Sequence, residues 1–213
     1  FKASETMVAG TVVPPRIDLI NEELLTSHFN AYILMELSLA DLNSSVSELL
    51  DLSNDKNIAV KQNILDAIDN GILNYKQNWI DSYKKVIASI EPELKEMWWY
   101  SDNWLDAKID SFSQRFDKAF DRWRNLYVSA KTMILKSRIV LDDPVIKSDS
   151  DQKIEAKRQH AIGLKQIELL KNDTKKSFKD QSEFYIFRYL AYEGFLPGYN
   201  FKRLHVRTFI GYK

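Results

Sequence analysis

The sequence predicts a mainly α-helical protein, a multi-helix bundle with one long central helix and short β-strands at both ends. Two observations predict this fold class. Apolar side chains recur at three- and four-residue steps through most of the chain. Glycine and proline are scarce, at 6 and 5 of 213 residues. Because 45% of the residues are hydrophobic, the chain can bury its own core, and we expect residues 1–213 to form one domain.

The amino-terminal residues 1–16 are expected to form a short strand and a proline turn. The segment from Met7 to Val13 is rich in β-branched residues, and Pro14-Pro15 ends it because proline cannot donate a hydrogen bond to a sheet. A helical core is predicted to follow over residues 17–141. Asp18 or Asn21 is the expected N-cap of its first helix.

Shorter helices are predicted over residues 44–52, 58–68 and 72–90. Asn70-Gly71 should separate the last two, since glycine accepts the left-handed conformation that ends many helices. An aromatic group, Trp98, Trp99, Tyr100 and Trp104, comes next. We expect most of it to lie in the core, with Trp99 or Tyr100 as the exposed member; the alternative is a platform that stacks nucleic-acid bases.

The long helix is expected over about residues 102–141. Its apolar residues alternate four- and three-residue steps, which is the pattern of a helix that packs lengthwise along another helix. They are Leu105, Ile109, Phe112, Phe116, Ala119, Trp123, Leu126, Ala130 and Met133. Beyond this helix, residues 151–194 should form further helices, and residues 195–213 a turn and a strand over 203–210.

Basic residues form a row beside this apolar seam. Lys108, Arg115, Arg122 and Lys136 lie at heptad spacing, with Lys118 one turn from two of them. The chain as a whole is neutral, but residues 1–106 hold 8 Lys and Arg against 17 Asp and Glu, whereas residues 107–213 hold 22 against 13. The row could follow a nucleic-acid backbone. It could equally be the flank of the seam, solvated or paired with carboxylates of a neighbouring helix.

The sequence contains no recognisable catalytic motif. It has no phosphate-binding loop of the G-x-x-x-x-G-K-[ST] type, no G-x-G-x-x-G turn and no G-x-S-x-G elbow. The three histidines, His28, His160 and His205, are far apart, and cysteine is absent, which excludes a thiolate metal site. We therefore expect no catalytic residue, metal or cofactor in this chain. With no apolar run long enough to cross a bilayer, we expect a cytoplasmic location and no membrane partner.

Both ends of the chain resemble a known family. Residues 7–19, then Asn21-Glu-Glu-Leu24, Ser27-His28 and Ala31, resemble a segment that follows the second motor domain in large bacterial superfamily 2 helicases of the DEAD/DEAH-box type. Residues 193–201, with 203–204 and 206–207, look like the partner segment that closes the same region. The nearest likeness is to DISARM-type, DrmA-like anti-phage defence helicases. Proline is typical of the family where this chain has Lys202 and His205.

The resemblance implies a helical accessory domain of an ATP-dependent DNA helicase. ATP and Mg²⁺ would then be bound only by motor domains of the same polypeptide, and the partners would be single- or double-stranded DNA, those motor domains and defence-complex subunits. The basic row would guide the strand, with Arg16 and Arg203 as secondary contacts. The alternative is a protein-interaction module that docks a partner subunit through Phe120, Tyr127 and Ile134 on the long helix.

Overall fold

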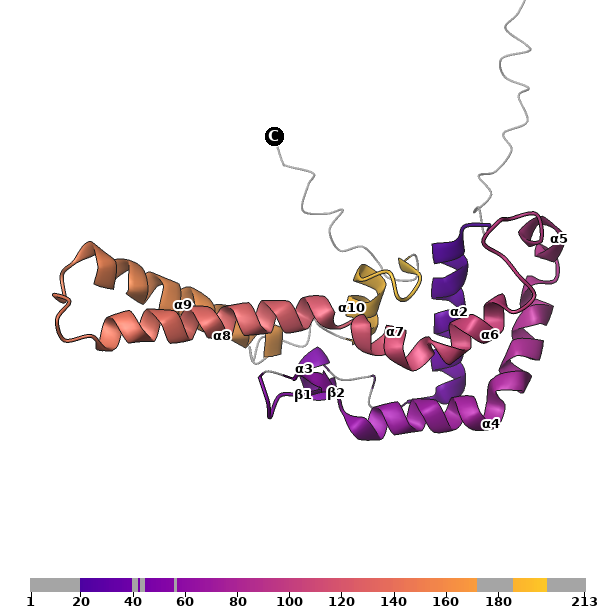
Figure 1. The fold of residues 1–213 in the computed structure, drawn as a ribbon, viewed down its shortest axis with the longest axis horizontal. Helices are drawn as coiled ribbons and strands as arrows, with labels where there is room; N and C mark the ends of the chain where they lie inside the picture. The colour runs from indigo at the N-terminus through magenta and orange to yellow at the C-terminus, as the bar shows by residue number, and fades with distance from the viewer. Residues whose placement is uncertain (1–19, 40–41, 43–44, 56, 172–185, 199–213) are drawn as a thin grey trace, which may run out of the picture.

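The computed structural model describes residues 20–39, 42, 45–55, 57–171 and 186–198, and these are mainly helical, as predicted. Two parts are distinct in Figure 1: a body, made of the described residues up to 120 and after 185, and a hairpin of two long helices, residues 121–171, that extends away from it. The predicted strands over 7–13 and 203–210 lie outside the described residues.

The body begins with α2 (Glu22–Leu37), which is capped by Asn21, one of the two expected caps: the Asn21 side chain accepts a hydrogen bond from the backbone N–H of Leu24 at 3.0 Å. After α2, the helix predicted over 44–52 is reduced to α3 (Val46–Leu49). The chain then extends as β1 (Leu50–Asp51), which pairs antiparallel with β2 (Ala59–Val60). These elements are followed by α4 (Gln62–Ile87) and α5 (Glu91–Leu94).

The predicted helix boundary at Asn70-Gly71 is wrong, because α4 continues through it. A Cβ at Gly71 would lie 2.4 Å from Leu37 Cδ2 and 3.1 Å from the ring of Trp79. Glycine therefore serves here to let the end of α2 pack closely on α4, and not to end a helix. Figure 1 shows α4 bending along its course so that it borders the body on two sides.

The predicted rod over 102–141 is divided into three helices, α6 (Trp104–Asp110), α7 (Phe112–Lys118) and α8 (Asp121–Asp142). At Ser111 the hydroxyl donates to the carbonyl of Ala107 at 2.8 Å, a local bond that commonly bends helices. At Phe120 the N–H bonds only three residues back, to Asp117 O at 3.1 Å, which tightens the turn. The helical region begins and ends where predicted, but α6 and α7 run oblique to α8 (Figure 1).

The two breaks bring a set of aromatic rings into the centre of the body. Phe112, Phe116 and Phe120 are all fully buried, and Phe116 lies against both others, with ring centroids 6.2 and 5.3 Å apart. Helix α10 (Ile186–Tyr192) covers them, and Tyr189 stacks on Phe120. The aromatic group before α6 is mostly covered, as expected, but its exposed member is Trp98, with 93% of its surface accessible.

Candidate functional site

The structure places three of the predicted cations around one pocket of the body. Lys108, Arg115 and Lys118 line a pocket of about 590 Å³ whose other walls come from α2 and from the turn after α10. We call it the Arg115 pocket. Its remaining lining residues are Glu22, Glu23, Thr26, Asn30, Ala119, Glu193, Gly194 and Phe195. Of the four residues at heptad spacing, Lys108 and Arg115 line this pocket, and Arg122 and Lys136 do not.

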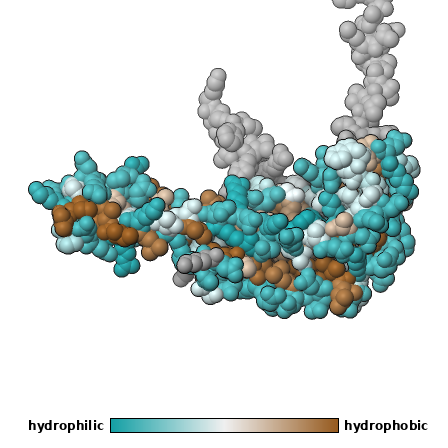
Figure 2. Space-filling view, in the orientation of Figure 1, coloured by the Kyte–Doolittle hydropathy of each residue, from teal (hydrophilic) through white to brown (hydrophobic). Residues whose placement is uncertain are grey.

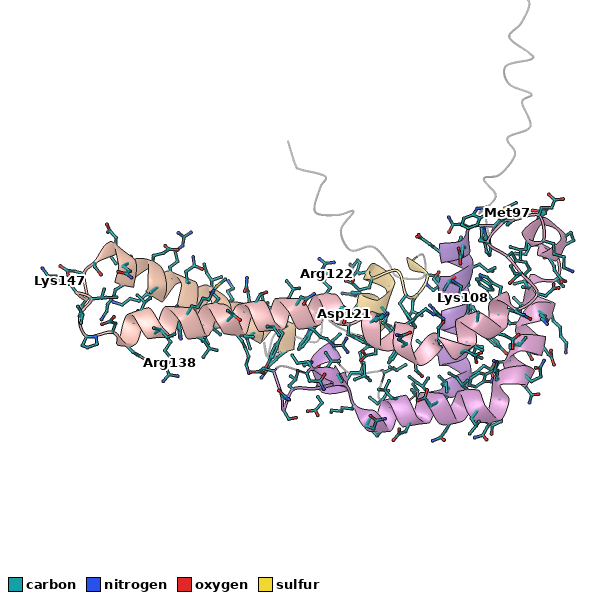
Figure 3. All side chains as sticks on the ribbon, in the orientation of Figure 1. Met97, Lys108, Asp121, Arg122, Arg138 and Lys147 are labelled. Atoms are coloured by element: carbon teal, nitrogen blue, oxygen red, sulfur yellow. The ribbon has the colours of Figure 1, made fainter. Side chains whose placement is uncertain are left out.

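Two members of the basic row are already paired with carboxylates. Lys108 Nζ lies 2.9 Å from Glu22 Oε1, and Arg122 Nη1 lies 3.2 Å from Glu193 Oε1. Figure 3 shows Lys108 inside the body beside α2, and Arg122 at the start of α8 near α10. Lys108 is mostly covered, so its pair with Glu22 leaves little charge for a phosphate backbone, whereas the Arg122 side chain is 68% accessible and its exposed pair holds it only weakly.

Arg115 is a mostly buried residue that ties three segments together. Its guanidinium donates to Asn30 Oδ1 at 2.8 Å, to the carbonyl of Lys108 at 2.6 Å and to the hydroxyl of Ser111 at 3.2 Å. Asn30 in turn donates through Nδ2 to the carbonyl of Phe195 at 2.9 Å. Burial lowers the pKa of Arg115 to about 10, so the group is still charged at pH 7.

The other predicted site residues do not complete a row. Lys118 is exposed at the rim of the Arg115 pocket, and Lys136 lies far along the hairpin. Arg16 and Arg203 lie outside the described residues. With the rod divided and two of its charges paired, the described cations do not form one continuous track in the register that was predicted.

The hairpin is the second candidate site. Helix α8 packs antiparallel on α9 (Asp151–Lys171) through small buried residues such as Ala130, Ser137 and Ala156. At Gly163 a Cβ would lie 2.7 Å from Ile134 Cγ1 and 3.1 Å from the carbonyl oxygen of Ala130. The absence of a side chain there therefore sets how closely the two helices approach.

The hairpin is attached to the body at its base. The indole N–H of Trp123 donates to the carbonyl of Leu170 at 3.3 Å, and the backbone N–H of Trp123 donates to the Tyr189 hydroxyl at 3.0 Å. Lys131 Nζ pairs with Asp55 at 2.6 Å. Within the part of the chain that the structure describes, the main apolar core includes Tyr127 and Leu170 but no residue farther out along the hairpin.

Beyond that base, apolar side chains are exposed along one side of the hairpin. Leu135 and Ile139 keep 62% and 71% of their surface accessible, and Val128 keeps 40%; spacings of seven and four residues place the three on one face of α8. Figure 2 shows hydrophobic residues on the exposed surface of the hairpin. Next to them lies a groove of about 700 Å³, the hairpin groove, lined by Val128, Ser129, Thr132, Met133, Lys136, Ser137, Val140, Gln152, Glu155, Ala156 and Gln159.

The expected exposure of Phe120, Tyr127 and Ile134 is wrong for two of them. Phe120 is buried in the body and Tyr127 at the base of the hairpin, and only Ile134 lies beyond that base. Val128, Leu135 and Ile139, which were not predicted as a surface, form a second apolar line on α8 outside the main seam. It was hidden because the seam itself accounted for the helix periodicity.

Among the described residues, no group of three or more His, Asp or Glu side chains converges as a metal site, and no helix has the length and apolar character needed to span a membrane. The chain matches no family model, no curated protein and no solved structure. The helicase resemblance therefore stays a prediction. The described parts of its two terminal segments do contact each other, through the hydrogen bond from Asn30 to Phe195.

Proposed function

We propose that this chain is a non-catalytic helical docking module that holds a helix of a partner protein in the hairpin groove. The observation that carries the proposal is the exposed apolar line of Val128, Leu135 and Ile139 beside that groove. An amphipathic helix normally buries its apolar stripe against another element. On the hairpin, α9 covers one side of α8, and this second line is left without a described partner.

The spacing of the exposed apolar line beside the groove suits a third helix. A helix laid into a groove between two others buries residues at three- and four-residue intervals, which is how many peptide helices are recognised. Val128, Leu135 and Ile139 offer contacts over about 16 Å of helix axis, at 1.5 Å per residue. A docked helix would turn the two-helix hairpin into a three-helix layer with a core of its own.

The charge of the hairpin indicates the chemistry of the partner. Residues 121–171 hold 11 Lys and Arg against 7 Asp and Glu, a net charge of +4. Lys136 lines the groove, and Arg138 and Lys147 extend from the hairpin in Figure 3. A partner helix with an apolar face and acidic flanks would therefore be favoured over a basic one.

Site-specific photo-crosslinking in the native host tests the proposal. A photoreactive residue replaces Ile139 in one version of the chain and Leu73, an exposed residue of α4, in the matched control. We expect a protein adduct at 139 that disappears when Val128→Glu and Leu135→Glu are added, with helical content unchanged by circular dichroism. Equal crosslinking at 73 and 139, or an adduct that survives the double substitution, would reject the docking module.

A second candidate is nucleic-acid guidance as the accessory domain of a larger helicase. The observation in its favour is that exposed cations lie on the hairpin: the side chains of Arg138 and Arg158 are 71% and 72% accessible. The strand would then follow the hairpin and not the predicted row. Arg138 and Arg158 each pair with a carboxylate on their own helix, but ion pairs this exposed contribute little stability and can be exchanged for a phosphate.

Fluorescence anisotropy with single- and double-stranded DNA over a salt series separates this candidate from the first. The hairpin variant Lys136→Gln/Arg138→Gln/Arg158→Gln should lower the salt dependence by about 0.7 per lost phosphate contact on a single strand. The row variant Lys118→Gln/Arg122→Gln serves as control and should change it less. No measurable DNA binding at low salt would reject nucleic-acid guidance and leave the docking module untouched.

A further inference from the structure

Arg115 and Arg124 are both largely covered by protein, and they differ in their partners. Arg124, whose side chain is 13% accessible, pairs with Asp117 and, at 2.6 Å, with Asp121. Arg115 makes three hydrogen bonds, all to neutral groups, and lies over the rings of Phe112 and Phe195. A covered charge is usually paired with an opposite one. Among the described residues, no carboxylate lies within ion-pair distance of Arg115.

The guanidinium of Arg115 has unused hydrogen-bonding capacity. Arginine carries five N–H groups, and one on each of its three nitrogens is used, to Ser111, Asn30 and Lys108. Two remain. The residue lines the Arg115 pocket, which has the volume of a small-molecule site, so a ligand there would lie beside the guanidinium.

A second group on the pocket wall also lacks a partner. The hydroxyl oxygen of Thr26 is shielded from solvent, and no described group is hydrogen-bonded to it. Leaving a covered hydroxyl without a partner is unfavourable, because the group has lost its hydrogen bonds to water. Such a group is expected where a ligand completes the bonding.

The charged residues that line the pocket balance in number, and Arg115 is the covered cation among them without a described carboxylate partner inside the body. Glu22, Glu23 and Glu193 stand against Lys108, Arg115 and Lys118. Glu22 is paired with Lys108, and Glu193 with Arg122, which lies outside the lining. The three glutamates around the pocket would repel the repeated charges of a phosphodiester chain, so the pocket discriminates against a polymer and in favour of a small ligand.

We propose that the Arg115 pocket is a binding site for the oxyanion group, carboxylate or phosphate, of a small molecule. The free N–H groups of Arg115 and the ammonium of Lys118 hold the oxyanion, and the hydroxyl of Thr26 donates to it. The site is independent of the hairpin groove. Its ligand would add a contact among α2, α7 and the turn after α10, which Arg115 and Asn30 already join, and so would stabilise the body by mass action.

The test is a titration of the ¹⁵N-labelled chain with two probes, inorganic phosphate and acetate, at ionic strength held constant with chloride. The side-chain Nε–H of Arg115 and the amides of the turn after α10 are followed by NMR. Saturable shifts with phosphate alone assign a phosphate site, and saturable shifts with acetate alone assign a carboxylate site. Shifts that do not saturate with either probe overturn the proposal.

Three variants show whether the named groups are the ligands. Lys118→Gln should weaken binding of the active probe at least fivefold, and the matched control Lys165→Gln, an exposed lysine on α9, should not. Thr26→Val should raise the melting temperature of the ligand-free chain, because the unpartnered hydroxyl is gone. The same substitution should weaken binding of the active probe. A Thr26→Val chain with unchanged affinity, or equal effects of the two lysine variants, would overturn the assignment.

Discussion

The body and the hairpin are both built from helices, yet they bury their apolar residues very differently. In the body, Phe29, Phe112 and Phe116 have no accessible surface. In the hairpin, Leu135 and Ile139 keep most of theirs, and the buried contacts are made by small residues such as Ala130 and Ala156. Body helices are covered on several sides, whereas each hairpin helix has one described neighbour beyond the base.

The difference teaches that burial depends on the number of layers and not on the helix sequence alone. Val128, Leu135 and Ile139 are as apolar as the residues of the body core. They stay exposed because a two-helix layer covers only one side of each helix. Since buried apolar area supplies most of the folding free energy, the body should determine the stability of the chain. The apolar surface that stays exposed on the hairpin can still be buried against a partner, which would favour binding.

The most direct way to break this comparison is to remove a ring from the body core. Phe116 lies against Phe112, Phe120 and Phe195 with no accessible surface. We expect Phe116→Ala to lower the free energy of unfolding by about 3–5 kcal/mol, because it leaves a cavity, as measured by urea denaturation. The control is Phe187→Ala on α10, where the side chain is partly exposed. A loss under about 1 kcal/mol at 116 would contradict the account of the body.

A substitution at the closest helix approach tests the hairpin. The Gly163→Val side chain would press on Ile134 and on the Ala130 carbonyl, and we expect a cost of about 1–3 kcal/mol. Amide hydrogen exchange should accelerate in α8 and α9 beyond Lys131, while protection in α2 and α7 is kept. The control is Ala161→Val, an exposed position of the same helix. Equal loss of protection in body and hairpin would show that the two parts unfold together.

Two ion pairs, one covered and one exposed, extend the comparison of body and hairpin to charged residues. In the body, Asp117 pairs with Arg124 and accepts from the backbone N–H of Val60 at 3.1 Å, whereas in the hairpin Asp142 pairs with Arg138 in the open. We expect Asp117→Asn to cost about 1–2 kcal/mol, since it leaves a covered guanidinium with less compensation. Asp142→Asn should cost under about 0.5 kcal/mol. Thermal unfolding of both variants measures the difference; equal losses would contradict it.

The smallest expected effect is a pH dependence from the body. Burial lowers the pKa of His28 below 6.5, so between the folded and unfolded pKa values the unfolded chain binds more protons. Stability from this group is complete above pH 6.5 and is lost as the pH falls through the folded value. His28→Gln should flatten the decline in melting temperature between pH 7 and 5.5, and His160→Gln in the hairpin is the control. An unchanged slope in His28→Gln would refute this assignment.

Local patterns in the sequence predict the helical elements well. The Asn21 cap, the end of α8 near residue 141 and the extent of α9 all follow from capping residues and apolar periodicity. Most of the long seam is buried up to Ala130, although Leu126 is not. The errors come from tertiary contacts that no local pattern contains. Leu37 packs over Gly71, and buried Phe120 accompanies the turn that divides the rod.

The candidate site was predicted less completely. Lys108 and Arg115, at heptad spacing, and Lys118, one turn from Arg115, line one pocket. The carboxylates that pair with the basic row are distant in the chain. Glu22 is 86 residues from Lys108, and Glu193 is 71 residues from Arg122. Charge pairing across such separations depends on how helices pack, so the sequence left the two readings of the basic row open.

The hydrogen bond between Trp123 and Leu170 has one more consequence. It joins the points where the polypeptide leaves the body and returns to it, 47 residues apart in sequence and 3.3 Å apart in space. Topologically, the segment between them is an insertion whose two ends meet. Shortening or lengthening the hairpin, or exchanging it for another antiparallel helix pair, would therefore place little demand on the packing of the body.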